Sequence, residues 1–490
     1  MNLIEDRWIP VRIAGTNEVK QIAPWEVVDT DIIGPVWGRA DFDMACHEFL
    51  IGLLFLACPP VDDADRLVKK NMTAEELKAA LEPYAAAFNL IGKGPLFMQE
   101  VALGEAIDEK NTRPLEALLL DGASRNSIRQ NNDLMRHRNH LGRASLPFAA
   151  MLLYTFQVYA PGSGAGNRIS LRGGGPMTVL LQAESQRLWD TLWLNVPYGR
   201  PSDMAILPWM QEKPMTSEEG NFHHCPDESG FTAEVFFGMP RRIFLITEDD
   251  EAVNFVQRPY GINYGRWFHP LSPYFRETAK SDWLAVHPRP WGFSCRDFFG
   301  IILDEPDARK RGCRSLLSLN MREFWQGKRG SEERYVYAVA AGWAMGKAYP
   351  LNYVRGISKL PHMNIEERKW LSDIIEATKI VSSVLYSSLS NTVGGGSLRD
   401  GVIDDFFMQI KYQFQEIQEC YFDKQSCENW LHSLRGMVFS YFDQLNLGGL
   451  SERSIPYIKR VAESRKIMWL ILHGHGRTGR KIYDLLGLNQ

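Results

Sequence analysis

The sequence predicts an α+β fold, in which a large mixed N-terminal domain (residues 1–362) is followed by a C-terminal antiparallel four-helix bundle (residues 363–490). Three observations lead to this prediction. A length of 490 residues exceeds one ordinary domain. Strand-like and helix-like apolar patterns alternate up to about residue 362, separated by proline and glycine turns. Beyond that point proline is rare and long helical patterns follow one another.

The elements of the N-terminal domain are predicted from the spacing of apolar residues. Alternation indicates strands, and recurrence every three to four residues indicates helices. Helices are expected at 41–58, 74–88, 115–120 and 146–158, and strands at 2–4, 8–13, 233–237, 242–247 and 335–341.

The C-terminal bundle is predicted from helical patterns at about 365–390, 401–420, 425–446 and 452–473. Short connections between them favour an antiparallel arrangement. Charge is uneven: residues 401–450 carry three basic and seven acidic side chains, and residues 451–490 carry eight and three. This asymmetry favours a basic face that contacts phosphate and an acidic face that contacts a basic partner, although ordinary solvated helix faces would show the same asymmetry.

The composition is that of an average soluble protein, with 45% hydrophobic and 23% charged residues. With a net charge of −4, nucleic-acid binding would require basic patches. The seven cysteines form no CxxC pair, which favours the reducing cytoplasm. The most apolar run, 49–58, is far shorter than the roughly 20 residues of a membrane span. We expect a cytoplasmic protein without membrane association.

Residues with catalytic or metal-binding chemistry are sparse. His223, His224 and Cys225 form the densest local group of ligand types, but no second pair follows at zinc-site spacing. The motifs of zinc proteases, P-loop proteins and serine hydrolases are absent. His473 and His475 could act as acid and base in RNA cleavage, yet no orienting partner is evident. We therefore expect no catalytic residue, metal or cofactor.

Two other features indicate nucleic-acid contact. Glycine-rich turns at 160–166 and 171–176 would let the backbone approach a phosphate or groove closely, although a simple hairpin turn fits as well. A dinucleotide-binding role is disfavoured, because the preceding segment reads as a helix and not a strand. The stretch 122–143 has five arginines and one acid, a composition typical of a loop that orders on RNA or DNA, with a merely solvated loop as the alternative.

Several motifs in their order along the chain resemble the CasA family, the large subunit of the type I-E CRISPR Cascade surveillance complex. The resemblance runs essentially from end to end. The motifs are Asn2 to Val11, Pro95 to Gln99, Ala160 to Gly162, Leu171 to Met177, Met239 to Ile243, Tyr260 to Gly265 and Trp267 to Pro273.

The resemblance implies a non-catalytic subunit of a ribonucleoprotein complex in antiviral defence. Such a subunit recognises the protospacer-adjacent motif in double-stranded target DNA, helps to open the duplex and recruits a nuclease-helicase. The implied partners are the 5′ end of the CRISPR guide RNA, target DNA, the nuclease-helicase, and the backbone, small and 5′-handle-binding subunits. The bundle would lie against the small subunits and help to guide the displaced strand.

The family's functional residues carry over by position. The DNA-binding loop falls on Gly162, Ser163, Gly164 and Ala165, and the basic finger falls on Arg258, where the family usually has lysine. The duplex-opening wedge falls on Gly346, Lys347 and Ala348, where the family can have glutamine. The loop toward guide RNA and neighbouring subunits falls on Arg125, Asn126, Arg129, Asn131, Asn132, Leu134, Met135, Arg136 and Arg138.

Three alternatives stay open from the sequence. The first is a ribonuclease that uses His473 or His475, and the second is a large subunit of a DNA-cleaving or otherwise repurposed Cascade variant. The third is a scaffold subunit without DNA contact. If the minor groove is read, loose tolerance for several motifs is expected, because that groove presents a degenerate pattern of hydrogen-bonding groups.

Overall fold

The structure, a computed structural model, contains two compact units: Met1–Pro290 with Gly300–Ile357, and Trp291–Phe299 with Ser358–Gln490. It describes the whole chain except residues 17, 109, 123–127, 132–137, 163, 165, 212–220, 277, 279, 298–302, 304–311, 316–334, 347–348, 362–363, 395, 420–422 and 489–490. For 106, 296, 312–315, 335, 361, 412 and 415–419, only the backbone is described. The predicted domain boundary at 362–363 lies outside the described residues, so the division into those domains stays a prediction.

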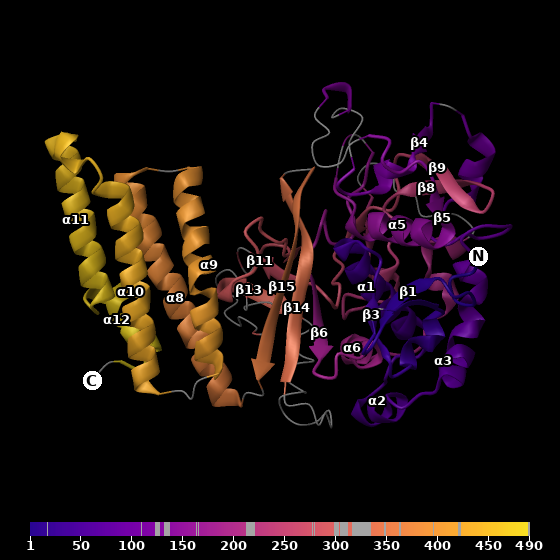
Figure 1. Cartoon of the computed structure of the whole chain (residues 1–490), viewed down its shortest axis with the longest axis horizontal. Coiled ribbons are helices and arrows are strands. Elements are labelled where there is room, and N and C mark those ends of the chain that lie inside the picture. The colour runs from indigo at the N-terminus through magenta and orange to yellow at the C-terminus, as the bar shows by residue number, and fades with distance from the viewer. Residues whose placement is uncertain are drawn as a thin grey trace. The chain divides into compact units, whose positions relative to one another are not determined.

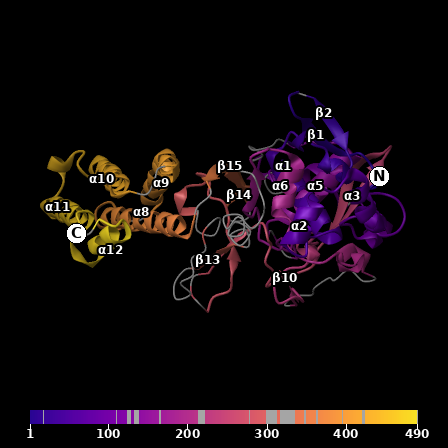
Figure 2. The same cartoon turned by 90° about the horizontal axis from the view of Figure 1, so that it is seen from below.

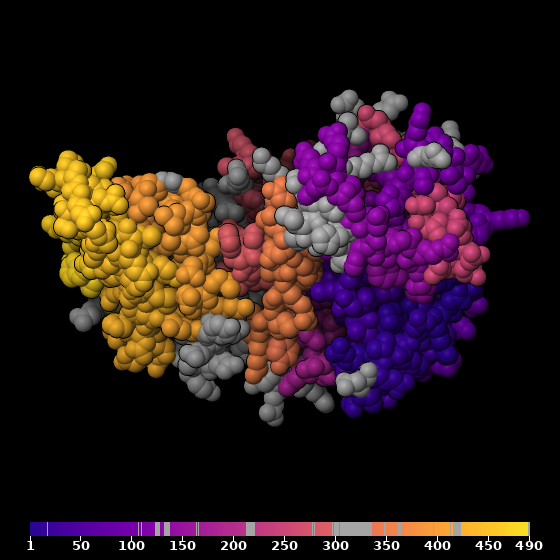
Figure 3. Space-filling model, turned by 45° about the horizontal axis from the view of Figure 1, so that its top comes forward, coloured from indigo at the N-terminus to yellow at the C-terminus, as the bar shows by residue number. Residues whose placement is uncertain are grey.

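The first unit is built around helix α1 (Ala40–Ala57), which is buried along almost its whole length. Phe49 lies at its centre and makes edge contacts with Trp8, Phe88, Phe97 and Tyr154, among other rings. Large aromatic side chains supply much of the apolar area that stabilises a core. Figure 3 shows the indigo N-terminal segments and the magenta middle segments meeting along a continuous surface.

Further helices cover this core, and small sheets surround it (Figure 1). The helices are α2 (Asp63–Lys69), α3 (Ala74–Leu81), α5 (Leu146–Tyr159) and α6 (Leu188–Asn195). One sheet has the order β2-β1-β3, from Val19–Ile22, Ile9–Ile13 and Ile32–Pro35. Another has the order β15-β14-β6, from Tyr349–Pro361, Tyr335–Gly346 and Thr178–Ala183.

The remaining sheets are also small. Strand β9 (Glu251–Arg258) is flanked by β4 (Thr112–Pro114) and β5 (Ala144–Ser145), and it pairs along its length with β8 (Arg242–Glu248). The order β12-β11-β13 joins Leu284–Ala285, Pro273–Arg276 and Gly312–Ser315. Strands β7 (His223–His224) and β10 (Tyr264–Gly265) pair in parallel.

Four predicted elements differ from the structure. The strand expected at 2–4 is wrong: Asn2 makes only an isolated bridge with Asn89, and Leu3 and Ile4 lie in a turn that the Asn2 side chain stabilises by accepting from the Ile4 N–H at 2.9 Å.

The helix expected at 74–88 ends at Leu81 and continues as a 3-10 helix (Glu82–Phe88), because Pro83 has no N–H to donate. The segment 115–120 is also 3-10, at Leu115–Leu118. The predicted strand at 233–237 is wrong: Ala233–Phe236 is a 3-10 helix whose consecutive residues are all buried, so the period of two that a half-buried strand requires is absent.

The described part of the second unit contains five α-helices. The central one is α8 (Ile365–Thr392), which contacts each of the other four. These are α9 (Ser397–Glu419), α10 (Lys424–Asn446), α11 (Ile455–Leu472) and α12 (Gly476–Leu485). Figure 2 shows α9 and α10 nearly end-on. The buried face of α8 carries residues such as Leu371, Ile374 and Leu385, at the spacing of an amphipathic helix.

Helix α12 was not predicted, because its glycines weaken the helical signal. Gly479 is nevertheless required where α12 crosses the end of α11. A Cβ at this position would lie 2.5 Å from the Ile471 carbonyl oxygen and 2.7 Å from the Gly474 carbonyl carbon. The C-terminal bundle therefore contains the four predicted helices and an additional fifth, α12. The predicted α+β fold class is confirmed. Among the described residues, no helix is long and apolar enough to cross a membrane.

Candidate nucleic-acid interface

The predicted glycine loop is fastened to the end of β9. The Tyr260 N–H donates to the Gly166 carbonyl oxygen at 2.8 Å, and Gln257 Nε2 donates to Asn167 Oδ1 at 2.9 Å. Gly166 has a φ of +74°, and a Cβ there would lie 2.5 Å from Pro259 Cβ. Within the predicted loop itself, Gly162 is half-buried and Gly164 is exposed, whereas Ser163 and Ala165 lie outside the described residues.

Arg258, the predicted basic finger, ends β9 and lies opposite Arg242 on β8. Arg242 is neutralised by a bidentate ion pair with Glu100, with N–O distances of 2.5 and 2.6 Å. Arg258 instead donates to a neutral amide, Asn111 Oδ1, at 2.5 Å. In the part of the chain that the structure describes, it has no carboxylate partner, so its positive charge is available to a phosphate or a base edge.

The second glycine-rich turn connects the loop to β14. The Gly175 N–H donates to the Tyr159 carbonyl oxygen at 3.0 Å, and a Cβ on Gly174 would lie 2.6 Å from Pro161 Cα. On its other side, a Cβ on Gly175 would lie 2.7 Å from Trp343 Cβ. Strand β14 ends three residues later at Gly346, the first predicted wedge residue. Lys347 and Ala348 lie outside the described residues.

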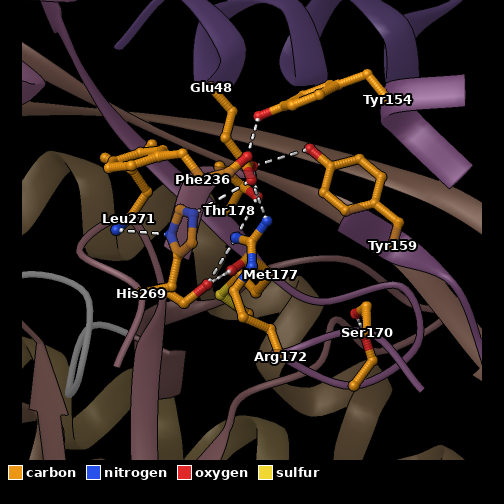
Figure 4. A network of polar contacts seen from close by, with 12 residues as sticks. Glu48, Tyr154, Tyr159, Ser170, Arg172, Met177, Thr178, Phe236, His269 and Leu271 are labelled. Carbon is orange, nitrogen blue, oxygen red and sulfur yellow. Dashed lines mark hydrogen bonds and ion pairs between the residues drawn. The ribbon is translucent and has the colours of Figure 1, made fainter. Parts of the chain in front are cut away.

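A buried polar network anchors this turn to α1 (Figure 4). The Arg172 guanidinium contacts Glu48 Oε1 at 2.6 Å, and both side chains are almost fully buried. Arg172 also donates to Thr178 Oγ1 at 3.0 Å and Ser272 Oγ at 2.9 Å. Tyr159 donates to Glu48 Oε2 at 3.3 Å. These bonds satisfy buried polar groups that would otherwise destabilise the fold.

His269 completes the network as a neutral ring. Its Nδ1 accepts from the Leu271 N–H at 3.2 Å, which puts the proton on Nε2, and Nε2 lies 3.2 Å from Glu48 Oε1 without hydrogen-bond alignment. Burial lowers the pKa of His269 to about 4, with the Arg172 charge acting in the same direction. Burial alone would raise the pKa of Glu48, but the adjacent Arg172 charge outweighs it and the pKa falls to about 2. Glu48 is therefore an ionised partner for Arg172.

The predicted guide-RNA loop is described only in part. Arg129 and Asn131 are exposed, and Arg138 Nη2 donates to Asn131 Oδ1 at 2.9 Å. The predicted contacts Arg125, Asn126, Asn132, Leu134, Met135 and Arg136 lie outside the described residues.

The histidines singled out in the sequence have structural partners. His223 Nε2 lies 3.0 Å from Glu234, and its backbone carbonyl accepts from Trp267 Nε1 at 2.8 Å. His473 donates to the Trp469 carbonyl oxygen at 2.8 Å and stacks on its ring. Among the described residues, no group of three His, Cys, Asp or Glu side chains could hold a metal ion.

Sequence reasoning missed Glu48 and, with it, the role of two recognised motifs. Arg172 and His269 belong to the segments 171–177 and 267–273, and both converge on this carboxylate. A signal was present, because Glu48 is the one acid between Met44 and Ala57, in a strongly apolar helix. A buried acid in such a helix requires a cationic partner.

Comparison with known proteins gives the family. The model of CRISPR-associated protein Cse1 matches residues 2–440. The structure is similar to Thermus thermophilus CasA, with a TM-score of 0.66 and 18% identity over 99% of both chains. It is similar to Thermobifida fusca Cse1, with a TM-score of 0.67 and 15% identity over 100% of this chain and 99% of that one.

A chain of a structure described as a CRISPR RNA-guided surveillance complex matches with a TM-score of 0.71 and 14% identity, over 96% of this chain and 99% of that one. At such identities, structural likeness establishes a shared fold. The family model, however, spans most of the sequence. This chain therefore belongs to the CRISPR-associated Cse1 family.

Proposed function

We propose that this chain is the large subunit of an RNA-guided Cascade complex, and that its first unit recognises the protospacer-adjacent motif in double-stranded DNA. Arg258 carries the proposal: its charge has no carboxylate partner among the described residues, and it lies beside a glycine loop whose backbone can approach a groove closely. Arginine suits a narrow minor groove, where the negative potential is enhanced.

The proposed role needs no catalytic group of this chain. Recognition depends on hydrogen bonds and charge, and guide pairing reads the remaining target sequence. The nuclease-helicase would supply DNA cleavage after recruitment by this subunit. The solved surveillance complex that shares this fold supports assembly with guide RNA and with other subunits. We include exposed Arg129 and half-buried Arg138 in the proposed guide-RNA contact.

The test is the binding of target duplexes with varied flanking motifs to the reconstituted complex, with and without this chain. Motif-dependent affinity should require the chain and should fall about 5- to 100-fold in Arg258→Ala, the range for losing one good base-edge contact. The matched control is Arg7→Ala, because Arg7 is exposed, already paired with Glu26 and outside the stretch expected to contact nucleic acid. Equal binding without the chain would favour the scaffold alternative.

A further inference from the structure

The first unit contains a cavity of about 320 Å³ that no part of the proposed DNA interface uses. It is lined by strands β1 and β3 of one sheet, by β6, β14 and β15 of another, and by helices α1 and α6; Figure 1 shows β3, β6 and α6 close together beside α1. The apolar part of its lining comes from Ile33, Val36, Leu180 and Val339. Its volume lies at the lower end of the range for small-molecule sites, about 300–1,000 Å³.

Two arginines bring positive charge to this cavity. Arg12 lies on β1 and Arg355 on β15, and both are exposed. Burial raises the pKa of the Asp43 carboxyl, and the charges of both arginines act on it in the opposite direction, so both lie near it. Among the described residues neither arginine forms an ion pair with a carboxylate. The two guanidiniums, held by different sheets, are therefore available to an anion such as a phosphate group.

Two hydrogen-bond acceptors reach the same cavity from α1. Asp43 and His47 are four residues apart and so lie on one face of this helix. His47 Nδ1 donates to the Asp43 carbonyl oxygen at 2.8 Å. Burial lowers the pKa of His47 to about 4, so the ring is neutral and Nε2 is an acceptor. Asp43 Oδ1 accepts from the Trp37 N–H at 2.7 Å. In the part of the chain that the structure describes, His47 Nε2 and Asp43 Oδ2 have no donor.

Gly34 keeps the space in front of His47 accessible. It lies on β3 opposite Arg12, and it lines the cavity. A Cβ at this position would lie 3.9 Å from His47 Nε2, and a longer side chain would extend into the space before the ring. The φ of Gly34 is not in the left-handed region, so the backbone conformation does not require glycine here.

We propose that this cavity binds one free ribonucleoside 5′-monophosphate. The phosphate, with a charge of about −1.5 to −2, would lie between Arg12 and Arg355. The two ribose hydroxyls would donate to Asp43 and His47, as ribose hydroxyls do to the carboxylate of many nucleotide sites. The base would pack against the apolar lining. The inference goes beyond the proposed function and does not depend on it, because the glycine loop and Arg258 contribute nothing to this cavity.

The experiment is isothermal titration calorimetry of the full chain with the 5′-monophosphates of adenosine, guanosine, cytidine and uridine. At least one of the four should bind saturably at one site per chain. Its 2′-deoxy counterpart and its unphosphorylated nucleoside should each bind about 10- to 100-fold more weakly, the range for losing a hydrogen bond to a charged group.

Three variants of the lining connect the binding to this cavity. Arg12→Gln and Arg355→Gln should each weaken the monophosphate about 10-fold or more and should leave the nucleoside unchanged, because only the phosphate is lost as a partner. Both should melt like the wild type, since these side chains are exposed and carry no ion pair among the described residues. Gly34→Val should abolish the binding of both ligands. Arg7→Ala is the control, because Arg7 is exposed, is paired with Glu26 and does not line the cavity.

The outcomes are separable. The inference is overturned if none of the four monophosphates binds at millimolar concentration, or if binding persists in both arginine variants and in Gly34→Val. Equal affinity for the ribose and deoxyribose forms would also overturn it, because Asp43 and His47 would then have no part in recognition. None of these results changes the motif-dependent binding of duplexes by the complex, so the proposed function stands or falls on its own test.

Discussion

The buried Glu48–Arg172 pair allows a quantitative test of how the glycine-rich turn is held. In Glu48→Met the Arg172 guanidinium keeps its charge, is almost fully buried and loses its carboxylate. Removing one partner of such a pair costs about 3–5 kcal/mol. Arg172→Met should cost a similar amount, because Glu48 is then left in an apolar site without its cationic partner.

The double variant distinguishes a paired charge from two independent packing contributions. With both charges gone, the remaining loss is the unpaired hydroxyls of Thr178 and Tyr159, about 1–3 kcal/mol in total, since the Ser272 hydroxyl still donates to the Met177 carbonyl oxygen. The double variant should therefore be more stable than the sum of the single effects by at least about 3 kcal/mol.

The assay is urea unfolding of the full chain, with thermal melting as a second measurement. Each single variant should lower the melting temperature by about 5–10 °C, at roughly 2 °C per kcal/mol for a unit of this size. Arg143→Ala is the control, since its ion pairs are exposed and should contribute less than about 1 kcal/mol. Single effects that add within about 0.5 kcal/mol would refute the reasoning.

Two further predictions concern pH and the fifth helix. Because burial lowers the pKa of His269 and of His47 to about 4, the unfolded chain binds protons that the folded chain does not, and the free energy of unfolding should decrease as the pH falls from about 6.5 to 5. Burial raises the pKa of Asp43 to about 6, and this carboxyl opposes part of the decrease. Urea unfolding of the wild type and of His269→Gln over this pH range would measure the contribution of His269. Equal pH profiles for the two proteins would contradict the prediction. Gly479→Ala should destabilise the second unit by about 1–3 kcal/mol, because its Cβ meets backbone and not a movable side chain, whereas Gly436→Ala, at a helical position with open space, should be neutral or slightly stabilising. Comparable melting temperatures for these two glycine variants would show that the crossing of α11 and α12 can relax.

Much of the local structure followed from periodicity. The expected helices at 41–58 and 146–158 appear as α1 and α5, and the strand at 242–247 appears as β8. Patterns of this kind succeed where one face of a long element is uniformly apolar. They failed at Ala233–Phe236, where both sides of a short segment are buried, and at α12, where glycines are retained for a close helix crossing.

The sequence by itself determined the fold class, the long helices and the motifs that resemble one family, because these depend on neighbouring residues. Only the tertiary structure decided which charged side chains are paired with an opposite charge. Arg242 and Arg258 are equivalent in the sequence, yet Glu100, far away along the chain, neutralises only the first. Glu48 likewise joins Arg172 and His269 across more than a hundred residues. Such pairings arise from the packing of distant segments, which the spacing of residues along the chain does not encode.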